Sequence, residues 1–209
     1  MITEEQQQLE RFSFAERCVH WIAAVSFLYV ALTGLALWTT QLFWLSHIFG
    51  GGEATRRWHP WGGLIFAFVL AVIVRKWFED MKLNHDDRIW IKKLQKYVTH
   101  DDEDLPEPGR FNAGQKMLFW IQSFSTILLL VSGIILWFPE DVSLSNPFRI
   151  AAILIHSSTA VISISSILIH IYMGTVAVPG ALESMLNGKV SRGWARMHHP
   201  NWYRDETKK

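Results

Sequence analysis

A long apolar stretch near the end of the chain, residues 150–178, constrains the fold more than any other feature of the sequence. It exceeds the roughly 20 residues that an α-helix needs to cross a bilayer. Two histidines interrupt it, His156 and His170, 14 positions apart. At about 100° and 1.5 Å per residue, both rings leave one helix face and lie roughly 21 Å apart along the axis. Two metal-binding rings at two depths indicate two stacked cofactors, although a membrane histidine can also serve packing and interhelical hydrogen bonding.

Three more apolar stretches precede this one, at residues 18–39, 58–78 and 113–138. Because the apolar blocks alternate with charged ones, the pattern is typical of a membrane protein rather than of a soluble core. We therefore expect an all-α integral membrane four-helix bundle that forms a single membrane domain over residues 1–209. The polar residues 79–112 form its central loop, and residues 179–209 form a basic, aromatic tail.

The composition excludes several functions. A net charge of +1 gives no basis for nucleic-acid binding. The single cysteine, Cys18, rules out an internal disulfide and an all-cysteine metal site. Residues 17–20 read RCVH and lack the C-x-x-C-H signature of covalent haem attachment. The polar start of the chain is not a cleavable signal peptide, so we expect the first apolar stretch to direct insertion.

Lysine and arginine set the orientation. The loop between the first two spans contains Arg56 and Arg57, and the loop between the last two contains only Arg149, whereas the central loop and the tail carry most of the basic residues. The positive-inside rule therefore predicts that both termini, the central loop and the tail lie in the cytoplasm.

With this orientation, the histidines within the spans fall at two heights. His59 and His156 lie toward the outside, and His20 and His170 lie toward the cytoplasm. Two imidazoles at each level are typical of a b-type haem that takes one axial ligand from each of two helices. Zinc would need three or four ligands at one point. A proton relay usually includes intramembrane Asp or Glu, and the span interiors have none.

The sequence around the remaining histidines gives less support for a role as a metal ligand. His47 lies in the outer linker, where a short interfacial helix is expected near residues 41–49, and it is a weaker alternative to His59. His85 and His100 lie among solvated charges and are predicted to be surface residues. For the adjacent His198 and His199 we favour a surface or subunit-contact role.

Two further features of the spans have alternative interpretations. Gly62 and Gly63 leave room beside the second span for a bulky group, or they allow tight helix packing. Pro60 is expected in the first helical turn, where it costs no intrahelical bond.

Two stacked haems imply electron transfer across the membrane, and the chain has no nucleotide, flavin or iron–sulfur motif of its own. The simplest acceptor is a quinone. Asn112, Gly114 and Gln115 begin the third span at the level of His170, where amide side chains can hydrogen-bond a quinone carbonyl. On spacing alone, the asparagine and glutamine are better explained as a helix cap.

Several motifs resemble the gamma subunit, a cytochrome b, of membrane-bound formate dehydrogenase, and the resemblance covers nearly the whole chain. The matching segments are RCVHW at residues 17–21, HPWGG at 59–63, FNAGQK at 111–116, LIHSSTA at 154–160, LIHIYM at 168–173 and KVSRGWARMHHPNWYR at 189–204. The acidic central loop and the short tail depart from the family.

This resemblance implies two b haems, with His20, His59, His156 and His170 as axial ligands to the haem iron. It also implies a menaquinone or ubiquinone site at Asn112, Gly114 and Gln115, which raises the quinone interpretation above the cap.

The implied partners are an iron–sulfur beta subunit and a molybdenum or tungsten alpha subunit that oxidises the substrate, in a bacterial inner-membrane complex that can form a higher oligomer. Electrons would enter at the outer haem and leave at the inner one. The alternatives are a cytochrome b of a hydrogenase or another oxidoreductase, and a non-redox membrane anchor.

Overall fold

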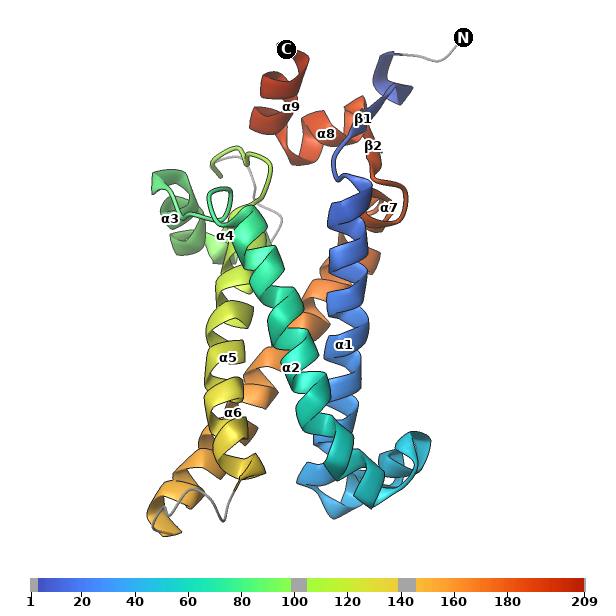
Figure 1. The fold of residues 1–209 in the computed structure, drawn as a ribbon. Helices are drawn as coiled ribbons and strands as arrows, with labels where there is room; N and C mark the ends of the chain where they lie inside the picture. The colour runs from blue at the N-terminus through green and yellow to red at the C-terminus, as the bar shows by residue number, and fades with distance from the viewer. Residues whose placement is uncertain (1–3, 99–104, 139–145, 209) are drawn as a thin grey trace. The chain divides into compact units, whose positions relative to one another are not determined.

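The computed structural model describes residues 4–98, 105–138 and 146–208 (Figure 1). The acidic run of the central loop, Asp101–Asp104, and the first part of the loop before the last span lie outside these residues. Within them, four helices are long and apolar enough to cross a membrane, which confirms the predicted fold class. They are α1 (Phe14–Trp38), α2 (Gly52–Trp77), α5 (Ala113–Trp137) and α6 (Asn146–Tyr172), and a π-helical turn, Met173–Ala177, continues α6.

The chain divides into two compact units. The helical unit comprises Cys18–Arg75 and Ile121–Leu168, and therefore contains most of the four long helices. The loop-and-tail unit comprises Met1–Arg17, Lys76–Trp120 and Ile169–Lys209. It adds the chain start, the central loop, the tail and the adjoining ends of the long helices.

Helices of the helical unit contact one another through aromatic and polar side chains. The rings of Phe27 and Phe66 join α1 to α2, with centroids 5.3 Å apart. Gln122 of α5 donates to Ser166 and accepts from Ser163, both of α6, at 2.8 Å in each case. Large apolar side chains such as Phe68 point outward instead, as expected of helices whose outer faces meet lipid.

The helices α1, α2 and α6 each begin earlier than the sequence predicts, and α6 begins at Asn146 rather than at residue 150. The helix α1 begins at Phe14 because Ser13 and Glu16 form a reciprocal cap, in which the Ser13 amide donates to the Glu16 carboxylate at 2.8 Å. The helix α2 begins at Gly52, so Pro60 lies in its interior and the prediction of a first-turn proline is wrong. Pro60 has no N–H to donate to the carbonyl of Arg56.

The linker between α1 and α2 forms the expected short helix, a 3₁₀ helix over Thr40–Phe49, which exposes Phe43 and Trp44. These aromatic rings are typical of a membrane interface.

The loop-and-tail unit contains the remaining short elements. They are a 3₁₀ turn at Glu4–Gln6, β1 (Gln8–Glu10), α3 (His85–Lys92), α4 (Leu94–Val98), α7 (Ala181–Asn187), β2 (Lys189–Ser191), α8 (Arg192–His198) and α9 (Pro200–Thr207). The strands β1 and β2 pair antiparallel, with Leu9 opposite Val190, so the chain start is fastened to the tail.

Gly188 permits this join. Its φ of +79° is left-handed, and a Cβ there would lie 2.6 Å from the Phe12 carbonyl oxygen. The Gly188 carbonyl accepts from the amides of Arg11 and Phe12.

Candidate functional site

Two of the predicted ligands face each other in the helical unit. The rings of His59, on α2, and His156, on α6, have centroids 6.4 Å apart and an interplanar angle of 72°. A metal–imidazole bond of about 2.0 Å puts the ring centre about 3 Å from the metal, so two imidazoles on opposite sides of one ion have centres about 6 Å apart. The pair therefore has the separation of two axial ligands.

The hydrogen bonds of His59 determine which ring nitrogen is free to bind a metal. Its Nδ1 lies 2.8 Å from the hydroxyl of Thr33, on α1. That hydroxyl donates its one hydrogen to the Tyr29 carbonyl at 2.7 Å, so it must accept from Nδ1–H. This assigns the proton to Nδ1 and leaves the lone pair of Nε2 for a metal.

His156 is held in the same way from α5. Its Nδ1 lies 2.9 Å from the hydroxyl of Ser132, which donates to the Leu128 carbonyl at 2.6 Å. The Ser132 oxygen therefore accepts from Nδ1–H, and the lone pair of this imidazole is also on Nε2. Thr33 is fully buried and Ser132 nearly so, so water does not compete for either bond.

A glycine follows each of these hydroxyl residues and lies beside the same ring. A Cβ on Gly34 would lie 3.3 Å from Cε1 of His59, and a Cβ on Gly133 would lie 3.2 Å from Cε1 of His156. Both distances are tighter than ordinary van der Waals contact. Two hydroxyl–glycine pairs on α1 and α5 thus shape the two histidine positions, and no pattern in the sequence indicated these four residues.

Gly62 and Gly63, on α2, each fit a different one of the two interpretations, tight packing and open space. A Cβ on Gly62 would lie 2.5 Å from the Tyr29 ring, so Gly62 permits tight packing of α1 against α2. A Cβ on Gly63 would meet nothing within 4 Å, so Gly63 borders open space.

The other predicted ligands lie in different units. His20 belongs to the helical unit and His170 to the loop-and-tail unit, and their pairing stays a prediction. His47 and His85 are exposed, which agrees with an interfacial position for His47 and a surface position for His85. His100 lies outside the described residues.

The predicted quinone residues begin α5 with a reciprocal cap. The backbone N–H of Gln115 donates to Oδ1 of Asn112 at 2.9 Å, and the backbone N–H of Asn112 donates to Oε1 of Gln115 at 3.0 Å. The cap interpretation of the spacing is therefore correct. It uses only the side-chain oxygens and leaves the NH₂ groups as possible donors. A Cβ on Gly114 would lie 3.4 Å from Oδ1 of Asn112, which is an ordinary van der Waals contact.

His199 is not a surface residue, so that prediction is wrong. It is 3% exposed, its Nδ1 lies 2.7 Å from the Gly109 carbonyl, and its Nε2 lies 2.8 Å from the Arg11 guanidinium. Burial, together with the charge of Arg11, lowers the pKa of His199 to about 3. The neutral ring therefore donates to Gly109 and accepts from Arg11, joining the tail to the chain start.

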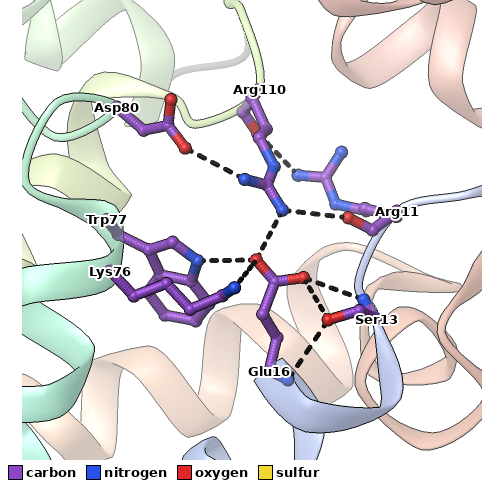
Figure 2. Close-up of polar contacts among 7 residues, drawn as sticks. All are labelled: Arg11, Ser13, Glu16, Lys76, Trp77, Asp80 and Arg110. Carbon is purple, nitrogen blue, oxygen red and sulfur yellow. Dashed lines mark hydrogen bonds and ion pairs between the residues drawn. The ribbon is translucent and has the colours of Figure 1, made fainter.

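Glu16 organises a second buried cluster of the loop-and-tail unit (Figure 2). Its Oε1 accepts from Trp77 Nε1 and from the Arg110 guanidinium, both at 2.9 Å. Arg110 also pairs with Asp80 at 2.9 Å. The carboxylate thus links the start of α1, the end of α2 and the segment before α5, and it has a structural explanation without a cofactor.

Comparison with known proteins agrees with this geometry. Residues 11–188 match the family described as prokaryotic cytochrome b561. The chain belongs to that family. It is similar, at 36% identity over 98% of this chain and 96% of the relative, to the formate dehydrogenase cytochrome b556(fdo) subunit of Escherichia coli K12.

The nitrate-inducible cytochrome b556(Fdn) subunit of the same organism is 34% identical over 96% of this chain and 93% of the relative. The cytochrome b556 subunit of formate dehydrogenase from Haemophilus influenzae is 34% identical over 91% of this chain and 80% of the relative. These matches confirm the resemblance to the cytochrome b subunits of formate dehydrogenases.

Membership of the cytochrome b561 family implies haem b, and with the four apolar helices it identifies a multi-pass protein of the bacterial inner membrane. The facing rings of His59 and His156 fit such a group, because their spacing admits a metal ion and both present Nε2 as the free donor.

Proposed function

We propose that this chain is the di-haem cytochrome b subunit of a formate dehydrogenase complex and carries electrons across the membrane to a quinone. The observation that carries the proposal is the facing pair His59 and His156, each with its proton on Nδ1. These two residues would hold the iron of the outer haem, which supplies one-electron chemistry when bound.

His20 and His170 would hold the inner haem. Two features of the sequence support this pairing. Both histidines are predicted to lie at the end of the spans opposite to His59 and His156, and they stand in the RCVHW and LIHIYM motifs on which the family resemblance rests. One haem toward each leaflet divides the crossing of a bilayer core about 30 Å thick into shorter electron-transfer steps.

The quinone would bind beside Asn112, Gly114 and Gln115. The cap holds both amide side chains in place through their oxygens, and their NH₂ groups are the donors that a quinone carbonyl requires. Menaquinone and ubiquinone share this carbonyl chemistry. The basic central loop and tail favour the cytoplasmic side for this end of the helices.

The proposed partners are an iron–sulfur subunit that delivers electrons at the outer haem and a molybdenum or tungsten subunit that oxidises formate. Similarity over at least 91% of this chain to three formate dehydrogenase subunits supports this assignment over a cytochrome b of a hydrogenase. Electrons would flow inward, and the quinone would take its protons from the cytoplasm.

The experiment is a reduced-minus-oxidised spectrum of the purified complex together with its haem content. We expect two b haems per chain, one lost in His156→Ala and the other in His170→Ala, with no loss in the control His47→Ala. The His170→Ala complex should still oxidise formate with an artificial acceptor while failing to reduce quinone. A colourless complex, or quinone reduction at the normal rate in His170→Ala, would contradict the proposal.

A further inference from the structure

A polar cavity of about 270 Å³ opens in the loop-and-tail unit where α5 begins. Its lining includes Asn112, which directly precedes α5, Lys116 of α5 and Asp87 of α3, together with the exposed carboxylates of Asp80 and Asp86. The cavity therefore connects the first turn of α5 with solvent through groups that bind water.

Lys116 and Asp87 form a buried ion pair at this cavity. The ammonium of Lys116 lies 2.7 Å from Oδ2 of Asp87, and each side chain is only 9% exposed. The same oxygen of Asp87 accepts the Asn84 amide at 2.9 Å, within the cap of α3. Both charged groups are thus held in place, because Asp87 lies in the first turn of α3 and Lys116 lies in the first turn of α5.

The ammonium has capacity for one more acceptor. It carries three N–H groups, and among the described residues its acceptors are Asp87 and, at 3.2 Å, the Lys82 carbonyl. Lys116 lies one turn after Asn112, whose carbonyl accepts the Lys116 amide at 3.1 Å. The two side chains therefore share one helix face and line the same cavity.

We propose that Lys116, held by Asp87, protonates the quinone oxygen that lies beside Asn112. The inference rests on the proposed function, which supplies the quinone and its two electrons. In this step an N–H bond of Lys116 breaks and an O–H bond forms on the reduced quinone. The lone pair left on Nζ then takes a proton from cavity water, and water protonates the second quinone oxygen.

The arrangement suits this role because a lysine ammonium releases a proton far more readily than a guanidinium does. Asp87 holds Nζ in position and stabilises the ammonium again after each transfer. The exposed carboxylates of Asp80 and Asp86, which line the cavity, attract protons from solvent.

The test uses the intact complex, reduced with dithionite and mixed with a short-chain menaquinone or ubiquinone while the absorbance of the reduced haem decays. We expect Lys116→Met to slow reoxidation by about 100-fold, as for loss of a general acid, and added methylammonium to restore part of the rate. Lys116→Arg keeps a charge opposite Asp87 and should be similarly slow. Lys92 of α3 is exposed and does not line the cavity, so it offers a control, and Lys92→Met should react at the normal rate.

Ferricyanide, which accepts electrons without protons, separates proton delivery from haem damage. All variants should reduce ferricyanide at the normal rate, and slow reduction would overturn the inference. A normal quinone rate in Lys116→Arg would also overturn it, since the pair would then be only structural. If quinone fails to reoxidise the unmodified complex, the proposed function itself is wrong.

Discussion

The hydroxyl of Thr33 gives the most direct test of the proposed haem site at His59 and His156. Replacing Thr33 with valine keeps the shape of the side chain and removes the acceptor of the His59 Nδ1–H bond. The threonine is 0% exposed, so water cannot take its place. An unpaired buried N–H costs about 1–3 kcal/mol, which is a factor of about 5 to 160 in an equilibrium constant. This agrees with the 10- to 100-fold typical of lost partners of metal-ligating histidines.

We therefore expect Thr33→Val to weaken binding of the outer haem by about 10- to 100-fold. Its midpoint potential should rise, because an imidazole whose Nδ1–H has no acceptor donates less charge to oxidised iron. Haem content and a redox titration of the purified complex measure the two effects. The inner haem should keep its potential.

Thr55 provides the matched control. It is equally buried on α2, and its hydroxyl makes the same bond to the carbonyl four residues earlier, at 2.8 Å to Gly51, without contacting a histidine in the described structure. Thr55→Val should leave haem content and both potentials unchanged. Unchanged haem affinity and potential in Thr33→Val would refute the assignment of Thr33 as a support of the ligand.

Two predictions concern packing and pH. Gly62→Ala should destabilise the α1–α2 contact by about 1–3 kcal/mol, because the new methyl group meets the Tyr29 ring, whereas the Tm of Gly63→Ala should stay close to that of the unmodified protein. The lowered pKa of His199 means that the unfolded chain binds a proton more readily than the folded one, so stability is complete above pH 6.5 and declines as the pH falls toward 3. At pH 5 the loss is about 2 kcal/mol. His199→Gln, which keeps a donor and an acceptor, should show a smaller drop in Tm between pH 8 and pH 5, and an equal drop would exclude His199 as the cause.

The sequence was sufficient for features that depend on local spacing. Apolar length predicted the four spanning helices, and an asparagine three residues before a glutamine predicted the cap at the start of α5. The meeting of His59 with His156 followed from the direction of each span, because helices that descend from the same side bring residues near their starts to the same height.

Contacts between distant residues were beyond such reasoning. Thr33 and Ser132 lie 26 and 24 positions before their histidines, and a hydroxyl within a helix is ordinarily explained by its bond to the preceding turn. His199 was misinterpreted because its partner, Arg11, is 188 positions away. The sequence pattern of the tail does not indicate that Arg11, at the start of the chain, covers the ring of His199.

The two hydroxyl–glycine pairs give the proposed haem site at His59 and His156 two similar halves. Thr33 and Gly34 on α1 serve the histidine of α2, and Ser132 and Gly133 on α5 serve the histidine of α6. The hydroxyl fixes the ring nitrogen that carries the proton, and the missing Cβ lets the neighbouring backbone approach Cε1. A ligand on a membrane helix therefore depends on the adjacent helix for its orientation. Under the proposed function, one axial position is therefore built by a pair of helices rather than by a single histidine, and the chain contains two such pairs.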